Sequence, residues 1–176
     1  PAMKVRALQR ESAYRWFGEL DPAGRLEFLC GLLDLLNPLE LRFAAACLEE
    51  LARKDQHSLR DAELRANSAA ELLNGAAPGA GPGEATAARS DLGDAAVRGR
   101  LLVSLALLRS DNREAANALY RTLGPPRDPR GNGAAQAGQA GQAGQELVLL
   151  YTMASNHPAF AFHHKQAFRL TLRELR

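Results

Sequence analysis

The stretch DPAGRLEFLCGLLDLLNPLELRF, residues 21–43, decides the fold class. Asp21 before Pro22 and Asn37 before Pro38 are two helix N-caps, each followed by a proline that the first helical position tolerates. Between these two starts, apolar residues recur at the spacing of one helix face. The stretch therefore predicts two consecutive helices with a short turn between them.

The same periodicity extends in both directions along the chain, and no segment alternates as a strand would. It predicts an all-α protein whose antiparallel helix pairs stack in a HEAT-like (pseudo-HEAT) arrangement. The expected helices cover residues 8–19, 22–36, 38–54, 58–73, 94–109, 112–123, 146–155 and 162–175.

Two segments rich in Gly, Ala and Pro interrupt the helical pattern. Residues 74–90 read NGAAPGAGPGEATAARS, and residues 124–145 contain GPPRDPRGNG and an AGQ repeat. Such segments have too little apolar surface to offset the entropy of ordering them. We therefore expect a flexible linker at 74–90 and a flexible loop at 124–145. They divide the chain into an N-terminal helical subdomain, 1–73, and a second helical subdomain, 91–176.

The helix expected at 22–36 is more apolar than one core face requires. Its apolar residues span about 220° of the circumference at 100° per residue. Either neighbouring helices of the same chain cover it on two sides, or one side meets a second copy of the protein. For the second interpretation, the candidate dimer contacts are Trp16, Phe17, Phe28, Leu32 and Leu35.

The sequence offers no catalytic or cofactor-binding constellation. Its glycines form no phosphate-binding loop or dinucleotide fingerprint. His157, His163 and His164 lack the spacing of metal ligands, and Cys47, expected to be buried in FAAACLEEL, has no identifiable base. We predict a non-enzymatic protein with no cofactor and no metal. No apolar run reaches the roughly 18 residues of a membrane span, and unpaired cysteines suit a cytoplasmic setting.

Charge is distributed unevenly along the chain. Residues 21–73 carry six Lys or Arg against ten Asp or Glu, whereas residues 125–176 carry six against three. On the last helix, Lys165, Arg169 and Arg173 form a basic stripe beside Phe168 and Leu172. This stripe is either a solvated edge or a docking site for an acidic amphipathic helix. Electrostatic RNA binding by the basic C-terminal half is the alternative function.

Several segments, read in order, resemble a known family. They are YRWF at 14–17, LEFLCGLLDLLNPLELRF at 26–43, CLEELARKD at 47–55, HSLRDAELRAN at 57–67, RGRLLVSLALL at 98–108, NREAANALYRTL at 112–123 and LYTMASNHPAFAFHHK at 150–165. Together they resemble the N-terminal domain of the CCHC zinc-knuckle proteins that act with noncanonical poly(A) polymerases and, more distantly, the N-terminal region of the Smaug translational repressors.

The resemblance implies a homodimerising, protein-binding helical scaffold in an RNA-regulatory protein. RNA would then be recognised by other domains of the full-length protein, because the chain contains no zinc knuckle. The resemblance provides no catalytic residue and no partner site at the level of single residues.

Overall fold

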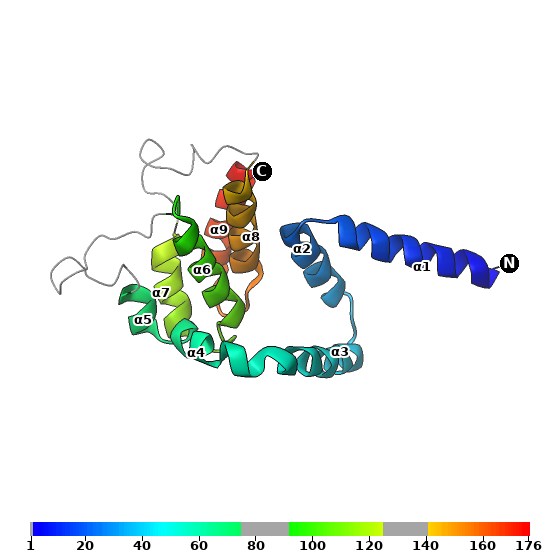
Figure 1. Ribbon diagram of the computed structural model, residues 1–176, viewed down its shortest axis with the longest axis horizontal. Coiled ribbons are helices and arrows are strands. Elements are labelled where there is room, and N and C mark those ends of the chain that lie inside the picture. The colour runs from blue at the N-terminus through cyan, green and yellow to red at the C-terminus, as the bar shows by residue number, and fades with distance from the viewer. Residues whose placement is uncertain (1, 75–91, 125–140) are drawn as a thin grey trace.

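The computed structural model describes residues 2–74, 92–124 and 141–176, without the side chains of 2–8 and 74 (Figure 1). Within these residues the chain is helical and contains no strand, which confirms the all-α prediction. The helices are α1 (Ala2–Glu19), α2 (Pro22–Leu33), α3 (Pro38–Ala52), the 3-10 turn η1 (Arg53–Asp55), α4 (Gln56–Ala66), α5 (Ala69–Asn74), α6 (Ala95–Leu107), α7 (Arg113–Leu123), α8 (Gln142–Asn156) and α9 (Phe162–Leu175).

The two predicted N-caps begin their helices. The Asp21 carboxylate accepts a hydrogen bond from the Gly24 N–H at 2.6 Å. The Asn37 side chain accepts from the Glu40 N–H at 3.0 Å, while the Glu40 carboxylate accepts from the Asn37 N–H at 2.9 Å. Each cap satisfies amide groups that the first helical turn leaves without a partner.

Other boundaries differ from the prediction. The helix predicted at 58–73 is broken after Ala66, and α2 ends at Leu33, three residues early. Residues 142–145, predicted as part of a loop, form the first turn of α8. Most of the predicted linker and loop lies outside the described residues.

Helices α4 to α9 pack into one bundle. α4 packs on α6, α6 on α8, α5 on α7, and α8 on α9. Tyr120 of α7 meets Phe168 of α9 edge-on, with ring centroids 5.5 Å apart. The fully buried side chains include Leu105, Leu119 and Leu150. The two helices before the second Gly-rich segment, α6 and α7, therefore pack on the two after it, α8 and α9. Two rows of helices, α4–α6–α8 and α5–α7–α9, suit HEAT-like pairs, which remain our proposal.

The turns within the three helix pairs are hydrogen-bonded to one another. Asn67, after α4, donates from Nδ2 to the Leu107 carbonyl at 2.9 Å and accepts from the Arg109 N–H at 2.8 Å. His157, after α8, is 3.1 Å from the Leu108 carbonyl, and Arg113 donates to the Ala159 carbonyl at 2.8 Å. These bonds fix the register of the pairs at one edge of the bundle.

Replacing Asn67 by alanine is expected to lower the free energy of unfolding by about 2 kcal/mol, because it removes hydrogen bonds worth about 1 kcal/mol each. Urea unfolding monitored by circular dichroism measures the loss. Asn117→Ala is the matched control, since Asn117 is exposed on α7 and alanine has the higher helix propensity. Equal stability of the two variants would contradict a structural role for Asn67.

Helices α1 to α3 are arranged differently. α2 packs on α8, and Glu27 of α2 is ion-paired with Arg176. α1 extends away from the bundle (Figure 1). No residue of α3 is buried, and Ala23 is the one buried residue of α2. α4 and α5, which precede the predicted linker, pack on the bundle, and so does α2. A boundary in the predicted linker stays a prediction.

Candidate protein interface

The five candidate dimer residues lie on α1, on α2 and just after it. Phe28 meets Trp16 edge-on at a centroid distance of 4.9 Å, and it meets Phe17 in a tilted arrangement at 6.0 Å. This aromatic cluster joins α1 to α2, yet Trp16 remains 47% exposed. Leu32 is 42% exposed and Leu35 80%. Trp16, Phe28, Leu32 and Leu35 are therefore available at the surface, whereas Phe17 is half-buried. α2 is covered by its own chain on the α8 side.

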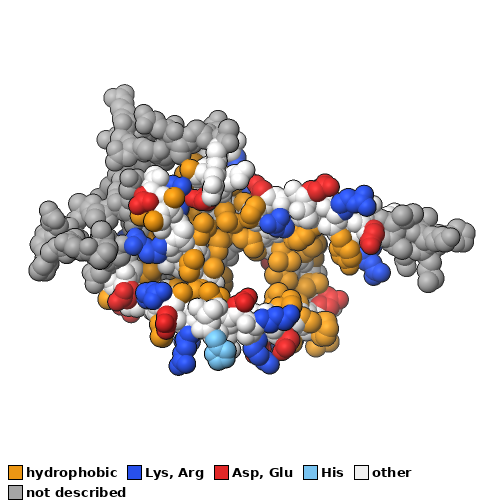
Figure 2. Space-filling view, viewed as in Figure 1, with side chains coloured by type: hydrophobic (Ala, Val, Ile, Leu, Met, Phe, Trp, Pro, Cys, Tyr) orange, Lys and Arg blue, Asp and Glu red, His pale blue; other side chains and the backbone are white. Residues whose placement is uncertain are grey.

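α3 exposes nearly all of its apolar residues. Leu39 is 82% exposed, Phe43 73% and Leu51 60%. Figure 2 shows hydrophobic side chains gathered over α2 and α3 and on the facing side of the bundle. Cys47 is exposed too, so the expectation that it is buried was wrong. The reason is that no other helix of the described chain covers this face of α3.

The two cysteines do not form a disulfide. Burial raises the pKa of the Cys30 thiol, and the nearby Asp34 carboxylate raises it further. A thiol with a raised pKa stays protonated and is a poor nucleophile. Among the described residues, no group of three side chains is arranged to hold a metal ion. None of the described helices combines the length and the hydropathy that crossing a bilayer requires.

The predicted docking residues on α9 divide between core and surface. Phe168 is 1% exposed and Leu172 7%, so both belong to the core. The prediction that these two are docking residues was wrong, because this side of α9 packs on α7 and α8. Arg169 and Arg173 are exposed, and Lys165 is half-buried at the edge. The exposed apolar residues of α9 are instead Phe162 and Leu170.

Two histidines near the α8–α9 turn have lowered pKa values. His157 Nδ1 accepts from the Ala159 N–H at 3.1 Å, so its Nε2–H donates to the Leu108 carbonyl. Burial lowers the pKa of His157, the hydrogen bond with Leu108 partly offsets this, and Lys165 lowers the pKa slightly further. Burial also lowers the pKa of His164, whose ring stacks on Tyr120 at 3.8 Å.

Mild acid should therefore destabilise the fold. The unfolded chain takes up protons on both histidines near pH 6.5, whereas the folded chain does so only at lower pH. The stabilisation is present above pH 6.5 and is lost as the pH falls through the lowered folded pKa values. Melting temperatures at pH 7.5 and 5.5 measure this loss. The decrease should be smaller in His157→Gln than in the unmodified chain or in His57→Gln, where an exposed histidine of α4 is removed. Identical decreases of the melting temperature in all three proteins would contradict a contribution of His157 to the acid sensitivity.

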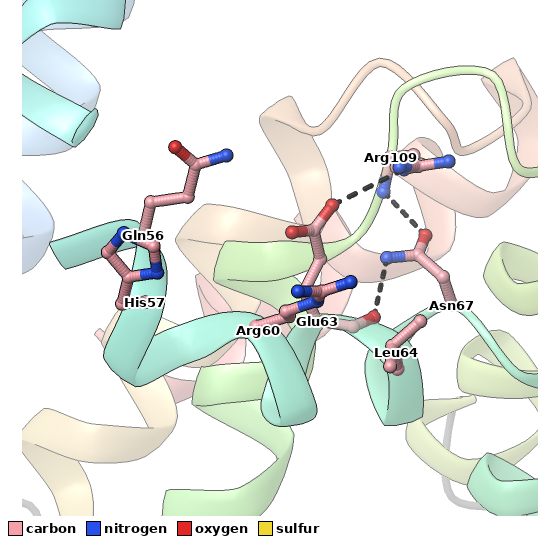
Figure 3. Close-up of a pocket in the computed structure, with 7 residues that line it drawn as sticks. All are labelled: Gln56, His57, Arg60, Glu63, Leu64, Asn67 and Arg109. Atoms are coloured by element: carbon pink, nitrogen blue, oxygen red, sulfur yellow. Dashed lines mark hydrogen bonds and ion pairs between the residues drawn. The ribbon is translucent and has the colours of Figure 1, made fainter.

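The turn network borders a pocket of about 530 Å³ (Figure 3). Its lining includes Arg60, Asn67 and Arg109. Glu63, the one carboxylate among its described lining residues, is 3.4 Å from the Arg109 guanidinium. Figure 3 shows Asn67 and Glu63 both directed toward Arg109. The pocket thus places an ion pair and amide side chains beside the turn. Among its described lining residues, no nucleophile is in contact with a base.

Two family models match this chain. One, described as the SMAUG-like PHAT domain, matches residues 59–176, which is more than half of the chain. The other, described as the RNA-binding protein vts1-like domain, matches residues 10–54. The two matches meet near η1.

Proposed function

Because the chain belongs to the SMAUG-like PHAT domain family, we propose that it is the self-associating and partner-binding scaffold of its protein. The two matched families indicate a post-transcriptional RNA-regulatory protein, and both are RNA-binding or regulatory families rather than enzymes. The closer assignment to the zinc-knuckle proteins that act on poly(A) tails is part of this proposal. So is a cytoplasmic location, which the unpaired Cys30 and Cys47 favour.

The observation that carries self-association is the uncovered apolar face of α3. A helix with one apolar face normally buries it, and contiguous exposed apolar surface marks an interaction site. Leu35, just after α2, and Leu39 and Phe43, on α3, are each more than 70% exposed. A second copy offers the same surface, so a two-fold symmetric dimer would cover both faces at once.

Size-exclusion chromatography with light scattering tests this proposal. We expect a mass of twice the 19.0 kDa of the chain at micromolar concentration. On dilution, the mass should fall toward that of the monomer only when the protein concentration approaches the dissociation constant of the dimer. A monomer at high micromolar concentration would overturn it.

The alternative function is direct RNA binding. The match to an RNA-binding domain family favours it, as do the exposed Arg169 and Arg173. The vts1-like match lies on α1–α3, however, and not on the basic C-terminal half. A salt titration separates the two functions, because binding to generic RNA through phosphate contacts weakens steeply as salt rises.

A further inference from the structure

One face of α9 combines exposed apolar and exposed basic residues. At 100° per residue, Phe162, Gln166, Arg169, Leu170 and Arg173 share about 100° of the helix circumference. Phe162 is 71% exposed and Leu170 60%, and the other three are exposed as well. The opposite arc of the helix contains His164, Phe168 and Leu172, which are buried. α9 therefore already packs on the bundle through its opposite side, and Phe162 and Leu170 are not needed for that packing.

The two arginines of this face have no carboxylate partner among the described residues. Arg176, further along the helix, is instead engaged by Glu27. Glu174, also exposed, lies outside this arc, about 40° beyond Leu170. The face is therefore positively charged next to two large apolar side chains. Arg and Phe are residue types enriched in protein interfaces.

We propose that this face of α9 binds an acidic amphipathic helix of another protein. This inference rests on the partner-binding part of the proposed function and names its site and partner chemistry. Phe162 and Leu170 are eight residues apart, or about 12 Å along the helix. A partner helix with apolar residues seven positions apart meets both of them. Glutamates or aspartates flanking that apolar strip then reach Arg169 and Arg173.

The apolar pair favours a protein helix over nucleic acid. Phosphate contacts require cations but make no use of a leucine such as Leu170. A helix that buries Leu170 and Phe162 gains apolar contact in addition to charge attraction. Binding should therefore have a salt-dependent part that depends on the arginines and a salt-independent part that depends on the apolar pair.

The test uses fluorescence anisotropy with a labelled synthetic helix of about 18 residues, with leucines seven apart and flanking glutamates. A scrambled peptide of the same composition and a generic single-stranded RNA are the comparison probes. Of the three probes, we expect only the amphipathic peptide to bind well. Arg169→Glu with Arg173→Glu should raise its Kd on the order of tenfold or more at low salt. Leu170→Ser should raise the Kd by about tenfold at both low and high salt.

The matched control is Arg60→Glu with Arg65→Glu, an equal charge reversal on exposed positions of α4. It should change the Kd less than twofold or so, because a solvated charge on another face contributes little. Absence of peptide binding, or equal binding of the scrambled peptide, would overturn the inference. Binding of the RNA alone, abolished by the α9 reversal, would assign the face to nucleic acid instead. The dimer mass of each variant, measured by light scattering, tests self-association separately.

Discussion

Replacing Phe168 by alanine is expected to lower the free energy of unfolding by about 4 kcal/mol, the loss typical of a buried phenylalanine. The side chain is 1% exposed and packs against Tyr120, Tyr151 and Phe160, with ring centroids 5.1 to 6.1 Å apart. Alanine leaves a cavity where α7, α8 and α9 meet, so both the transfer energy and the packing contacts are lost. Urea unfolding monitored by circular dichroism measures the difference.

Phe162→Ala is the matched control, because it removes the same side chain from the same helix at a position that is 71% exposed. It should change the stability by no more than about 0.5 kcal/mol. The pair distinguishes a core residue from a docking residue directly. A tolerated Phe168→Ala variant would mean that α9 does not pack on the bundle through this side.

Leu35→Glu is expected to dissociate the proposed dimer while leaving the monomer folded. Leu35 is 80% exposed in the single chain, so a carboxylate there remains hydrated and costs little. In a two-fold symmetric interface the charge is buried twice, once from each copy. A cost of about 1.5 kcal/mol at each copy weakens association by roughly a hundredfold or more. Light scattering should then give the monomer mass at concentrations where the unmodified chain is dimeric.

Leu64→Glu controls for the chemistry of the substitution. Leu64 is 66% exposed on α4, which belongs to the bundle. Its replacement by glutamate should therefore leave the dimer intact. A change in mass with Leu64→Glu and none with Leu35→Glu would move the interface away from α2 and α3.

The sequence was sufficient to predict the features that depend on local interactions. The caps at Asp21 and Asn37 involve only the next three residues, so the residue types alone identify them. The break after Ala66 was missed because Asn67 is held by the α6–α7 turn, about 40 positions away in the chain. A long-range bond of this kind leaves no periodic signal in the sequence.

Burial on α9 and α3 could not be predicted for a related reason. Helical periodicity shows which residues share a face, but it does not show which face has a neighbour. On α9, Phe162 and Leu170 are as apolar as Phe168 and Leu172, and only the contacts with α7 and α8 separate the pairs. On α3, the apolar face looked like core, whereas the described chain provides nothing to cover it.

The bonded turns at Asn67, Leu108 and His157 also bear on how this protein can vary. They fix the stacking of the helix pairs at one edge, so the connections from α5 to α6 and from α7 to α8 join helix ends at the other edge. The lengths of those connections then carry little structural information, and long insertions there cost little free energy. Insertion of an affinity tag into either connection should therefore leave the bundle folded.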